Sequence, residues 1–225
     1  MRQFREQLDF LVTEGYSTPT MGELAAMERP PGGRTAVITF DDGYIDNLAA
    51  LEELKKRGVR ASWFIVSGSI GQSPHWNADG RPQGRLLNAA ELRNMQADGM
   101  EIGSHSVNHP RLTELDDARL SMELVDSKSM LEDALDHEVT SFAYPYGDWN
   151  ARVASATEQA GYKAACTTRT GWAMRDKHPF TLRRITVYNT DTVSTLARKL
   201  AYAANDVDWS QLIRQQFSRR FPARS

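Results

Sequence analysis

Hydrophobic residues recur at two kinds of spacing along the chain, and the two kinds alternate. Apolar residues three or four positions apart indicate amphipathic helices, whereas short apolar runs between turn residues indicate buried strands. The helical spacing first occurs at Phe4, Leu8 and Leu11 and ends at Gly15. Further predicted helices cover residues 20–27, 46–57, 88–97, 116–136, 151–160 and 193–201, and predicted strands cover residues 35–40, 61–66, 100–103, 141–144, 162–166 and 182–187.

This repeated strand–helix order predicts an α/β fold, in which a parallel sheet is covered by helices. Capping boxes at Thr20 with Glu23 and at Asn88 with Glu91 mark the starts of two helices. Residues 67–87 and 169–180 show neither spacing, and we expect long loops there. A chain of 225 residues suits a single α/β barrel, so we assign residues 1–203 to one domain.

Composition narrows the class of protein. A hydrophobic fraction of 40% with 25% charged residues is typical of a soluble globular protein with a full core. The net charge of −2 gives no reason to expect a nucleic-acid partner. Cys166 is the only cysteine, so it has no disulfide partner in the chain, and we expect a small buried residue.

No targeting segment is evident in the sequence. The first residues are charged and amphipathic, unlike a secretion signal. No stretch approaches the ~20 apolar residues that cross a bilayer. A cytoplasmic location is therefore the default expectation, and the sequence leaves the compartment and the oligomeric state open.

Two short motifs have the composition of a metal site. Asp41 and Asp42 follow a predicted strand, and His105 and His109 follow another. One aspartate and two histidines suit a divalent metal that keeps a position open for water, and the second aspartate can then act as a base. Adjacent residues of a strand point to opposite sides, so the chain must turn at the aspartates, and Gly43 permits that turn. Each motif alone is also compatible with an ordinary turn or an exposed histidine pair, but together they favour metal binding.

The segment Phe142-Ala-Tyr-Pro-Tyr-Gly147 is a third motif after a strand. Active sites of parallel barrels form at the carboxyl ends of the strands, where all three motifs are expected. The Tyr146 N–H is a candidate donor to an oxyanion, and Pro145 has no N–H that could compete for this role. The alternative is a strand followed by an aromatic-rich turn.

The motifs beginning at Thr39, His105 and Phe142 resemble signature motifs of the polysaccharide deacetylases, the NodB-homology group of carbohydrate esterase family 4. The resemblance extends over roughly residues 4–200. It implies a distorted (β/α) barrel of about seven parallel strands, with one N-terminal strand fewer than in many relatives. It also implies metal-dependent removal of acetyl groups from N-acetylated sugars, in a polysaccharide or a lipid-linked glycan.

The same resemblance implies a role for each motif residue. The metal ligands would be Asp42, His105 and His109, and the metal would be Zn²⁺, with Co²⁺, Ni²⁺ or Mn²⁺ as alternatives. Asp41 would be the base for a metal-activated water that attacks the acetyl carbonyl. Tyr146 would donate its N–H to the resulting oxyanion.

The sequence lacks two features that have functions in many members of the family. Ala143 stands where many members have an arginine that orients the base, and the Leu-x-x-His motif that supplies an acid is missing. The segment 181–187, which contains the final predicted strand, is similar to the poly-N-acetylglucosamine deacetylase branch of the family. We hypothesise that Arg184 replaces the missing arginine and pairs with Asp41; a surface arginine is the alternative. His178 is a candidate acid, and a protonated Asp41 is the competing one.

Substrate contacts are expected from aromatic residues near the motifs. Trp76, Trp149 and Trp172 are candidates for stacking on sugar rings, together with Pro145 in the third motif. Each tryptophan is about as compatible with a place in the core.

The C-terminal segment, residues 204–225, lies outside the resemblance. Its apolar residues fall at helical spacing among arginines, which predicts a basic amphipathic tail helix. Such a helix can contact a membrane surface through residues 207–225, and the alternative is packing on the barrel or on a partner chain.

Two rival functions of the protein also stay open: a catalytically silent carbohydrate-binding relative, and a hydrolase of a small non-sugar amide.

Overall fold

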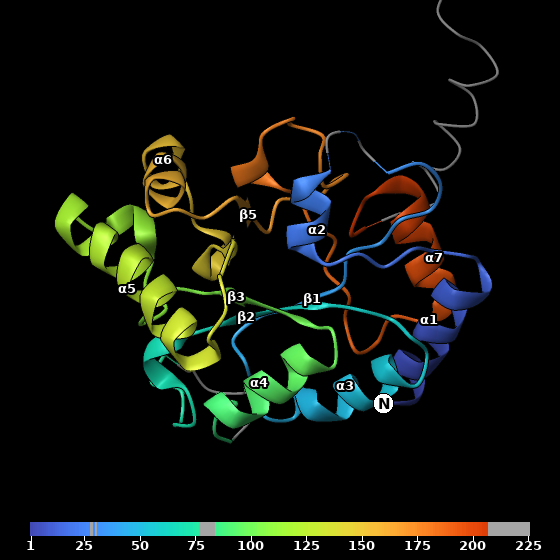
Figure 1. The fold of residues 1–225 in the computed structure, drawn as a ribbon. Coiled ribbons are helices and arrows are strands. Elements are labelled where there is room, and N and C mark those ends of the chain that lie inside the picture. Colours follow the sequence, from blue (N-terminus) through green and yellow to red (C-terminus); the bar gives the residue numbers. More distant parts are fainter. Residues whose placement is uncertain (28, 30, 77–83, 207–225) are drawn as a thin grey trace, which may run out of the picture.

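The computed structural model describes residues 1–27, 29, 31–76 and 84–206 and has a parallel sheet at its centre (Figure 1). Neighbouring strands of the sheet follow the order of the sequence. Because every pair is parallel, the carboxyl ends of all strands lie at one edge of the sheet. The strands are β1 (Thr39–Phe40), β2 (Ser62–Ile65), β3 (Glu101–Ser104), β4 (Ser141–Ala143) and β5 (Ala164–Cys166).

Helices surround this sheet (Figure 1). The predicted capping boxes at Thr20 and Asn88 are both confirmed, because each side chain accepts a hydrogen bond from the N–H of the glutamate three residues later. The helices are α1 (Arg2–Thr13), α2 (Met21–Ala26), α3 (Asn47–Lys55), α4 (Ala89–Ala97), α5 (Asp117–Leu135), α6 (Ala151–Gln159) and α7 (Val193–Tyr202).

Both faces of the sheet are buried. In β2, Trp63 and Ile65 join the large cluster formed with the outer helices, whereas Phe64 points to the other face. This second, inner cluster is small and includes Met21 of α2. Its remaining buried members are Ala143, Ala164, Cys166 and Leu182.

The described part of the chain forms five strands, whereas about seven were expected. The predicted strand 182–187 makes a single parallel bridge, from Leu182 to Cys166 of β5. At the other end, the predicted strand 35–40 is regular only at β1 and makes one further bridge, from Thr35 to Ser17. The missing regularity after Leu182 has a physical reason: residues 186–190 are exposed, and both backbone groups of Thr186 bind the side chains of Lys199 and Asn205.

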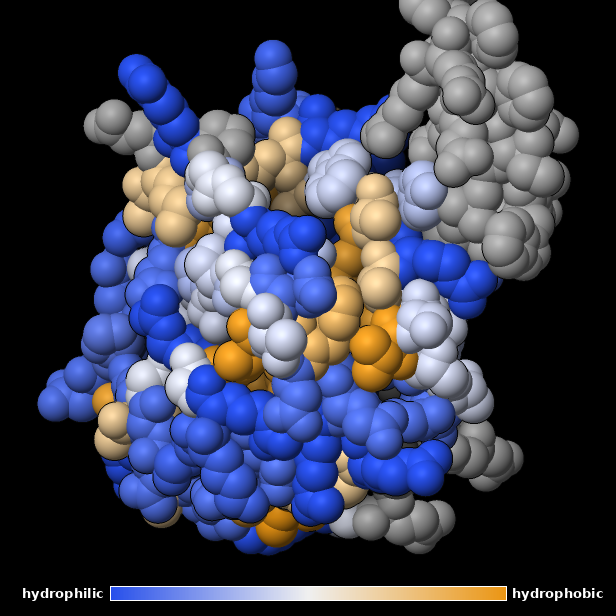
Figure 2. Space-filling view, turned by 90° about the vertical axis from the view of Figure 1, so that its right-hand side faces the viewer, coloured by the Kyte–Doolittle hydropathy of each residue, from blue (hydrophilic) through white to orange (hydrophobic). Residues whose placement is uncertain are grey.

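No helix in the described ranges has both the length and the apolar character needed to span a bilayer. Figure 2 shows the side of the molecule on which α1 and α7 lie, where polar side chains predominate and apolar groups occupy small areas near the middle. The predicted membrane contact, residues 207–225, lies outside the described residues. Of the predicted tail helix, residues 204–225, only residues 204–206 are described, and they are not helical.

Candidate active site

Asp41 and Asp42 lie immediately after β1, and the backbone turns at the second of them. Asp42 has a left-handed φ of 72° and Gly43 one of 83°, and the Gly43 N–H donates to the Asp41 carbonyl at 2.9 Å. A Cβ on Gly43 would come within 2.9 Å of the Ile65 side chain, so glycine is needed here for space as well as for its backbone conformation. The expected turn is therefore present, and it directs the two carboxylates to different partners.

Asp42 meets both histidines of the second motif. Its Oδ1 lies 3.5 Å from His105 Nε2 and 3.4 Å from His109 Nε2. All three side chains are buried, and their candidate ligand atoms lie within 4.8 Å of one another. One carboxylate oxygen and two imidazole nitrogens at this separation fit a divalent cation.

The surroundings of His105 favour the form that binds metals. Its Nδ1 lies 2.7 Å from the Ala143 carbonyl, which can only accept, so Nδ1 carries the proton and Nε2 presents a lone pair. Burial, and the neighbouring His109, lower the pKa of His105 against the opposing effect of the two aspartates. His105 is therefore neutral, as ligation requires.

The loop that carries the histidines is held on both sides. The Ser67 and Gly68 N–H groups, just after β2, donate to the Ser106 and Val107 carbonyls at 3.1 and 3.0 Å. On the other side, the Glu123 carboxylate of α5 accepts from the Val107 and Asn108 N–H groups, both at 2.9 Å. Its second oxygen accepts from Asn108 Nδ2 at 2.7 Å.

Left-handed backbone also recurs in this loop. Ser106 and His109 have φ values of 68° and 59°, and the Ser106 hydroxyl accepts from the His109 N–H at 2.9 Å. Residues in such conformations persist where surrounding contacts fix them, and they cluster at functional sites.

Asp41 forms a two-pronged ion pair with Arg184. The Arg184 Nη1 and Nη2 atoms lie 2.7 and 2.9 Å from the two carboxylate oxygens. Arg184 also donates through Nη1 to Thr39 Oγ1 at 3.2 Å and through Nε to the Thr167 carbonyl at 2.9 Å. The pairing hypothesised from the sequence is thus present in the structure, and Arg184 is not a surface residue, because 17% of its side chain is exposed.

This environment keeps Asp41 ionised. Burial alone would raise the pKa of Asp41, but Arg184, through its charge and its hydrogen bonds, is a main cause that lowers that pKa to about 2. The Asp41 side chain keeps 33% of its surface exposed. A fixed, ionised and accessible carboxylate beside a candidate metal site can accept a proton from a reacting water.

The third motif contributes an unusual backbone conformation. Tyr146 has a left-handed φ of 60°, and no described group accepts a hydrogen bond from its N–H. Gly147, with φ of 68°, lies so close to Thr168 that a Cβ would come within 2.0 Å of Thr168 Oγ1. The Tyr146 N–H is therefore available to a ligand, and the tight approach of Gly147 fixes the turn that carries it.

Aromatic rings enclose His109. Trp76 stacks on its imidazole at 4.9 Å between ring centroids, and Tyr146 meets it edge-on at 4.5 Å. The Arg111 guanidinium lies 4.7 Å from the centre of the Tyr146 ring. Trp76 Nε1 and His109 Nδ1 are buried and have no hydrogen-bond partner among the described residues.

The other candidate substrate residues differ in exposure. Trp172 is 58% exposed, whereas Pro145 is buried. Trp149 packs against the main core, stacks on Tyr144 at 6.4 Å and lies under the Arg169 guanidinium at 5.7 Å. Trp76 and Trp172 are thus the better placed of the four for contact with a ligand.

His178 caps a short 3-10 helix, Pro179–Thr181. Its Nδ1 accepts from the Phe180 N–H at 3.2 Å, and its carbonyl accepts from the Thr181 N–H at 3.2 Å. Its described contacts are with this helix rather than with the Asp41–Asp42 segment. Its role as an acid stays a prediction.

The sequence did not indicate Glu123 or Thr167. Glu123 lies on a helix 14 positions after His109 and has no motif around it. Thr167 acts through its backbone carbonyl, which leaves no trace in residue type. Thr39, by contrast, could have been found, because it lies two positions before Asp41 and so on the same face of the strand.

Comparison with known proteins finds relatives in both sequence and structure. A family model described as polysaccharide deacetylase matches residues 28–165. The Bacillus subtilis (strain 168) protein YxkH is 32% identical over 190 residues, which are 83% of this chain and 64% of YxkH. A chitooligosaccharide deacetylase of Rhizobium leguminosarum bv. trifolii is 25% identical over 132 residues, 58% of this chain and 54% of that protein. The chain therefore aligns with less than two thirds of the length of either relative.

A solved structure aligns with most of the chain. The Streptococcus pyogenes deacetylase PplD, in complex with acetate, has a TM-score of 0.78 and 25% sequence identity, and the match covers 88% of this chain and 86% of PplD. This similarity confirms the predicted distorted (β/α) barrel with flanking helices.

Proposed function

Because this chain belongs to the polysaccharide deacetylase family, we propose that it is a metal-dependent hydrolase that removes acetyl groups from N-acetylated sugars. The observation that carries the proposal is the position of the Arg184-bound carboxylate of Asp41 next to the cluster of Asp42 with two histidines. This arrangement supplies a base and a Lewis-acid site at one edge of the sheet. The sugar class is supported by the name of the chitooligosaccharide deacetylase, which is similar to this chain.

The metal would be held by Asp42, His105 and His109. A divalent cation of this kind, with Zn²⁺ as our first choice, makes a water more acidic and polarises a carbonyl. His105 is suited to this role because its Nδ1–H is bound to Ala143, which fixes the direction of Nε2.

Asp41 would take the proton from the attacking water. The two-pronged contact with Arg184 fixes the plane of the Asp41 carboxylate. One of its oxygens would then already be oriented toward the reacting centre, so that the side chain does not have to change rotamer. The Tyr146 N–H would donate to the developing oxyanion, supported by its left-handed backbone and its lack of a described acceptor.

The leaving nitrogen needs a proton, because an amine anion is a poor leaving group. We propose that Asp41 returns the proton it has taken, since it lies at the site already. His178 is the second candidate, and its contacts within the Pro179–Thr181 turn make it the weaker one.

Sugar rings would be bound by exposed aromatic surface at the rim. Trp76 beside His109, and Trp172 with its large exposed fraction, are the proposed stacking residues. Pro145 and Trp149 would act through the shape of the turn that carries Tyr146.

Acetate release from acetylated chito-oligomers tests the proposal. We expect the protein to release acetate, a chelator to abolish this activity, and added Zn²⁺ to restore it. Asp42→Asn should lose metal binding and turnover together, whereas Asp41→Asn should keep the metal and lose turnover. Oligomer binding without acetate release by the metal-loaded protein would instead indicate a silent carbohydrate-binding relative, and acetate release from small amides alone would indicate a non-sugar substrate.

A further inference from the structure

The segment that carries Arg184 has little support from the sheet. After the single bridge at Leu182, the backbone leaves β5, and residues 186–190 are exposed. Arg184 nevertheless contacts both oxygens of Asp41, which requires a fixed backbone. We propose that Asp191, Lys199 and Asn205 are positioning residues that hold this segment so that Arg184 orients the base; this inference rests on the proposed role of Asp41.

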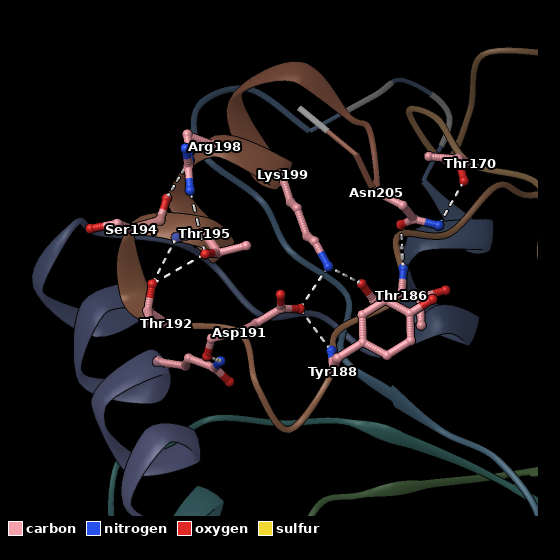
Figure 3. A network of polar contacts seen from close by, with 11 residues as sticks. Thr170, Thr186, Tyr188, Asp191, Thr192, Ser194, Thr195, Arg198, Lys199 and Asn205 are labelled. Carbon is pink, nitrogen blue, oxygen red and sulfur yellow. Dashed lines mark hydrogen bonds and ion pairs between the residues drawn. The ribbon is translucent and has the colours of Figure 1, made fainter. Parts of the chain in front are cut away.

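The centre of the arrangement is a buried ion pair between Lys199 of α7 and Asp191 (Figure 3). The Lys199 Nζ lies 2.6 Å from Asp191 Oδ2, and the side chains are 3% and 9% exposed. Lys199 also donates to the Thr186 carbonyl at 2.9 Å, two residues after Arg184. Asp191 Oδ2 accepts in addition from the Tyr188 N–H at 2.7 Å.

One further contact anchors this pair to the rest of the fold, and another joins it to the segment itself. The Gln7 side chain of α1 donates to the Asp191 carbonyl at 2.6 Å. The Lys199 ammonium lies 4.7 Å from the centre of the Tyr188 ring. Buried charges are costly, and here each has several partners, so the pair imposes one geometry on residues 186–191.

Asn205 provides the second connection, after the end of α7 (Figure 3). Its Oδ1 accepts from the Thr186 N–H at 2.8 Å, and its Nδ2 donates to Thr170 Oγ1 at 2.9 Å. The carbonyl of Arg169, the residue before Thr170, accepts a hydrogen bond from the Arg184 N–H at 3.0 Å. Asn205 therefore joins the segment that contains Arg184 to the neighbouring segment of Arg169 and Thr170, which also binds the Arg184 backbone.

These contacts replace a strand ladder. Both backbone groups of Thr186 are bound by side chains from the α7 region, where a regular strand would bind a neighbouring strand. The position of Arg184 thus depends on residues whose described contacts do not include the candidate metal ligands.

A double-mutant cycle tests the inference. Asn205→Ala leaves no buried charge behind, and we expect it to lower kcat by ~10- to 100-fold with KM changed less than about twofold, because a misplacement of about 1 Å can cost ~100-fold. In an Arg184→Ala background the same change should lower kcat less than about twofold. Lys199→Met should behave likewise, with Asp191→Asn/Lys199→Met as the paired variant if the single change prevents folding.

Arg198→Ala is the matched control. Arg198 lies on α7 one position before Lys199, and its hydrogen bonds go to Ser194 and Thr195 of the same helix (Figure 3). It should leave kcat unchanged. Melting temperature and metal content of each variant are measured alongside.

Two outcomes would overturn the inference. One is an unchanged kcat in Asn205→Ala; the other is an equal loss with and without Arg184, which would indicate a merely structural role. Failure of the proposed function is a separate result: Arg184→Ala itself would then leave turnover unchanged, or the wild-type protein would release no acetate.

Discussion

Removal of the Glu123 side chain should weaken metal binding although Glu123 touches no ligand. Its carboxylate accepts three hydrogen bonds from the loop between the two histidines. Glu123→Ala leaves the Val107 and Asn108 N–H groups without this acceptor. The loop backbone then has fewer contacts to hold the left-handed conformation that His109 requires.

The expected loss of metal affinity in Glu123→Ala follows from the kind of hydrogen bond that is removed. A hydrogen bond to a charged group contributes ~1.5–3 kcal/mol, but water can replace part of it on a half-buried loop. Loss of an outer-shell partner typically costs ~10- to 100-fold in metal affinity. We therefore expect the Kd for Zn²⁺ to rise by ~10- to 100-fold, which corresponds to about 1.4–2.8 kcal/mol.

The assay is a titration of metal-free protein with Zn²⁺ against a chromophoric chelator. Glu123→Gln keeps an oxygen acceptor for the backbone pair and should lose much less affinity than the alanine variant. Asp126→Ala, an exposed change on the same helix, is the control for effects on α5 in general. A Kd for Glu123→Ala equal to that of the wild type would refute the reasoning, as would an equal loss in Asp126→Ala.

Three further predictions concern residues at and away from the site. Gly147→Ala should lower the free energy of unfolding in urea by about 1–3 kcal/mol, because the new Cβ meets Thr168 and the backbone is left-handed; an unchanged midpoint would contradict this. Glu53 has a pKa lowered to about 2, chiefly by its hydrogen bond with Arg57, so its contribution to stability is present above its ordinary pKa of 4.5 and is lost as the pH falls toward 2. Glu53→Gln should accordingly melt below the wild type at pH 7, with a difference that narrows on acidification, and a difference constant with pH would argue against this role. His178→Gln should reduce kcat less than about tenfold if Asp41 is the proton donor, whereas a loss of ~100-fold or more would assign the acid to His178.

The sequence allowed the helices and the site motifs to be predicted for physical reasons that act locally. The capping boxes at Thr20 and Asn88 depend on residues three apart, and both occur in the structure. The turn at Asp42 and Gly43 was likewise predictable, because two adjacent carboxylates that both act at one site would require it. The Asp41–Arg184 pairing, 143 residues apart, was hypothesised only through the family pattern and the missing arginine at Ala143.

What the sequence did not predict depends on contacts between distant segments. The run after Leu182 has the composition of a strand, yet most of it forms no ladder. The Arg183 and Arg184 N–H groups bind carbonyls of the preceding loop, and both backbone groups of Thr186 bind the side chains of Lys199 and Asn205. Glu123 was missed for a related reason: its role is set by the packing of α5 against the histidine loop, and an isolated glutamate on a helix looks like any solvated residue.

The ion pair between Asp41 and Arg184 has a mechanical consequence for the fold. β1 and β5 are the two outermost strands of an open sheet. Asp41 directly follows β1, and Arg184 lies two residues after Leu182, which forms a bridge with β5. The Arg184 guanidinium therefore bridges the gap between the two edges of an incompletely closed barrel. In a closed barrel, backbone hydrogen bonds between strands would join these edges. Because this side-chain contact links the two edges, we expect a change that separates them also to release the carboxylate of Asp41, the proposed base, from Arg184.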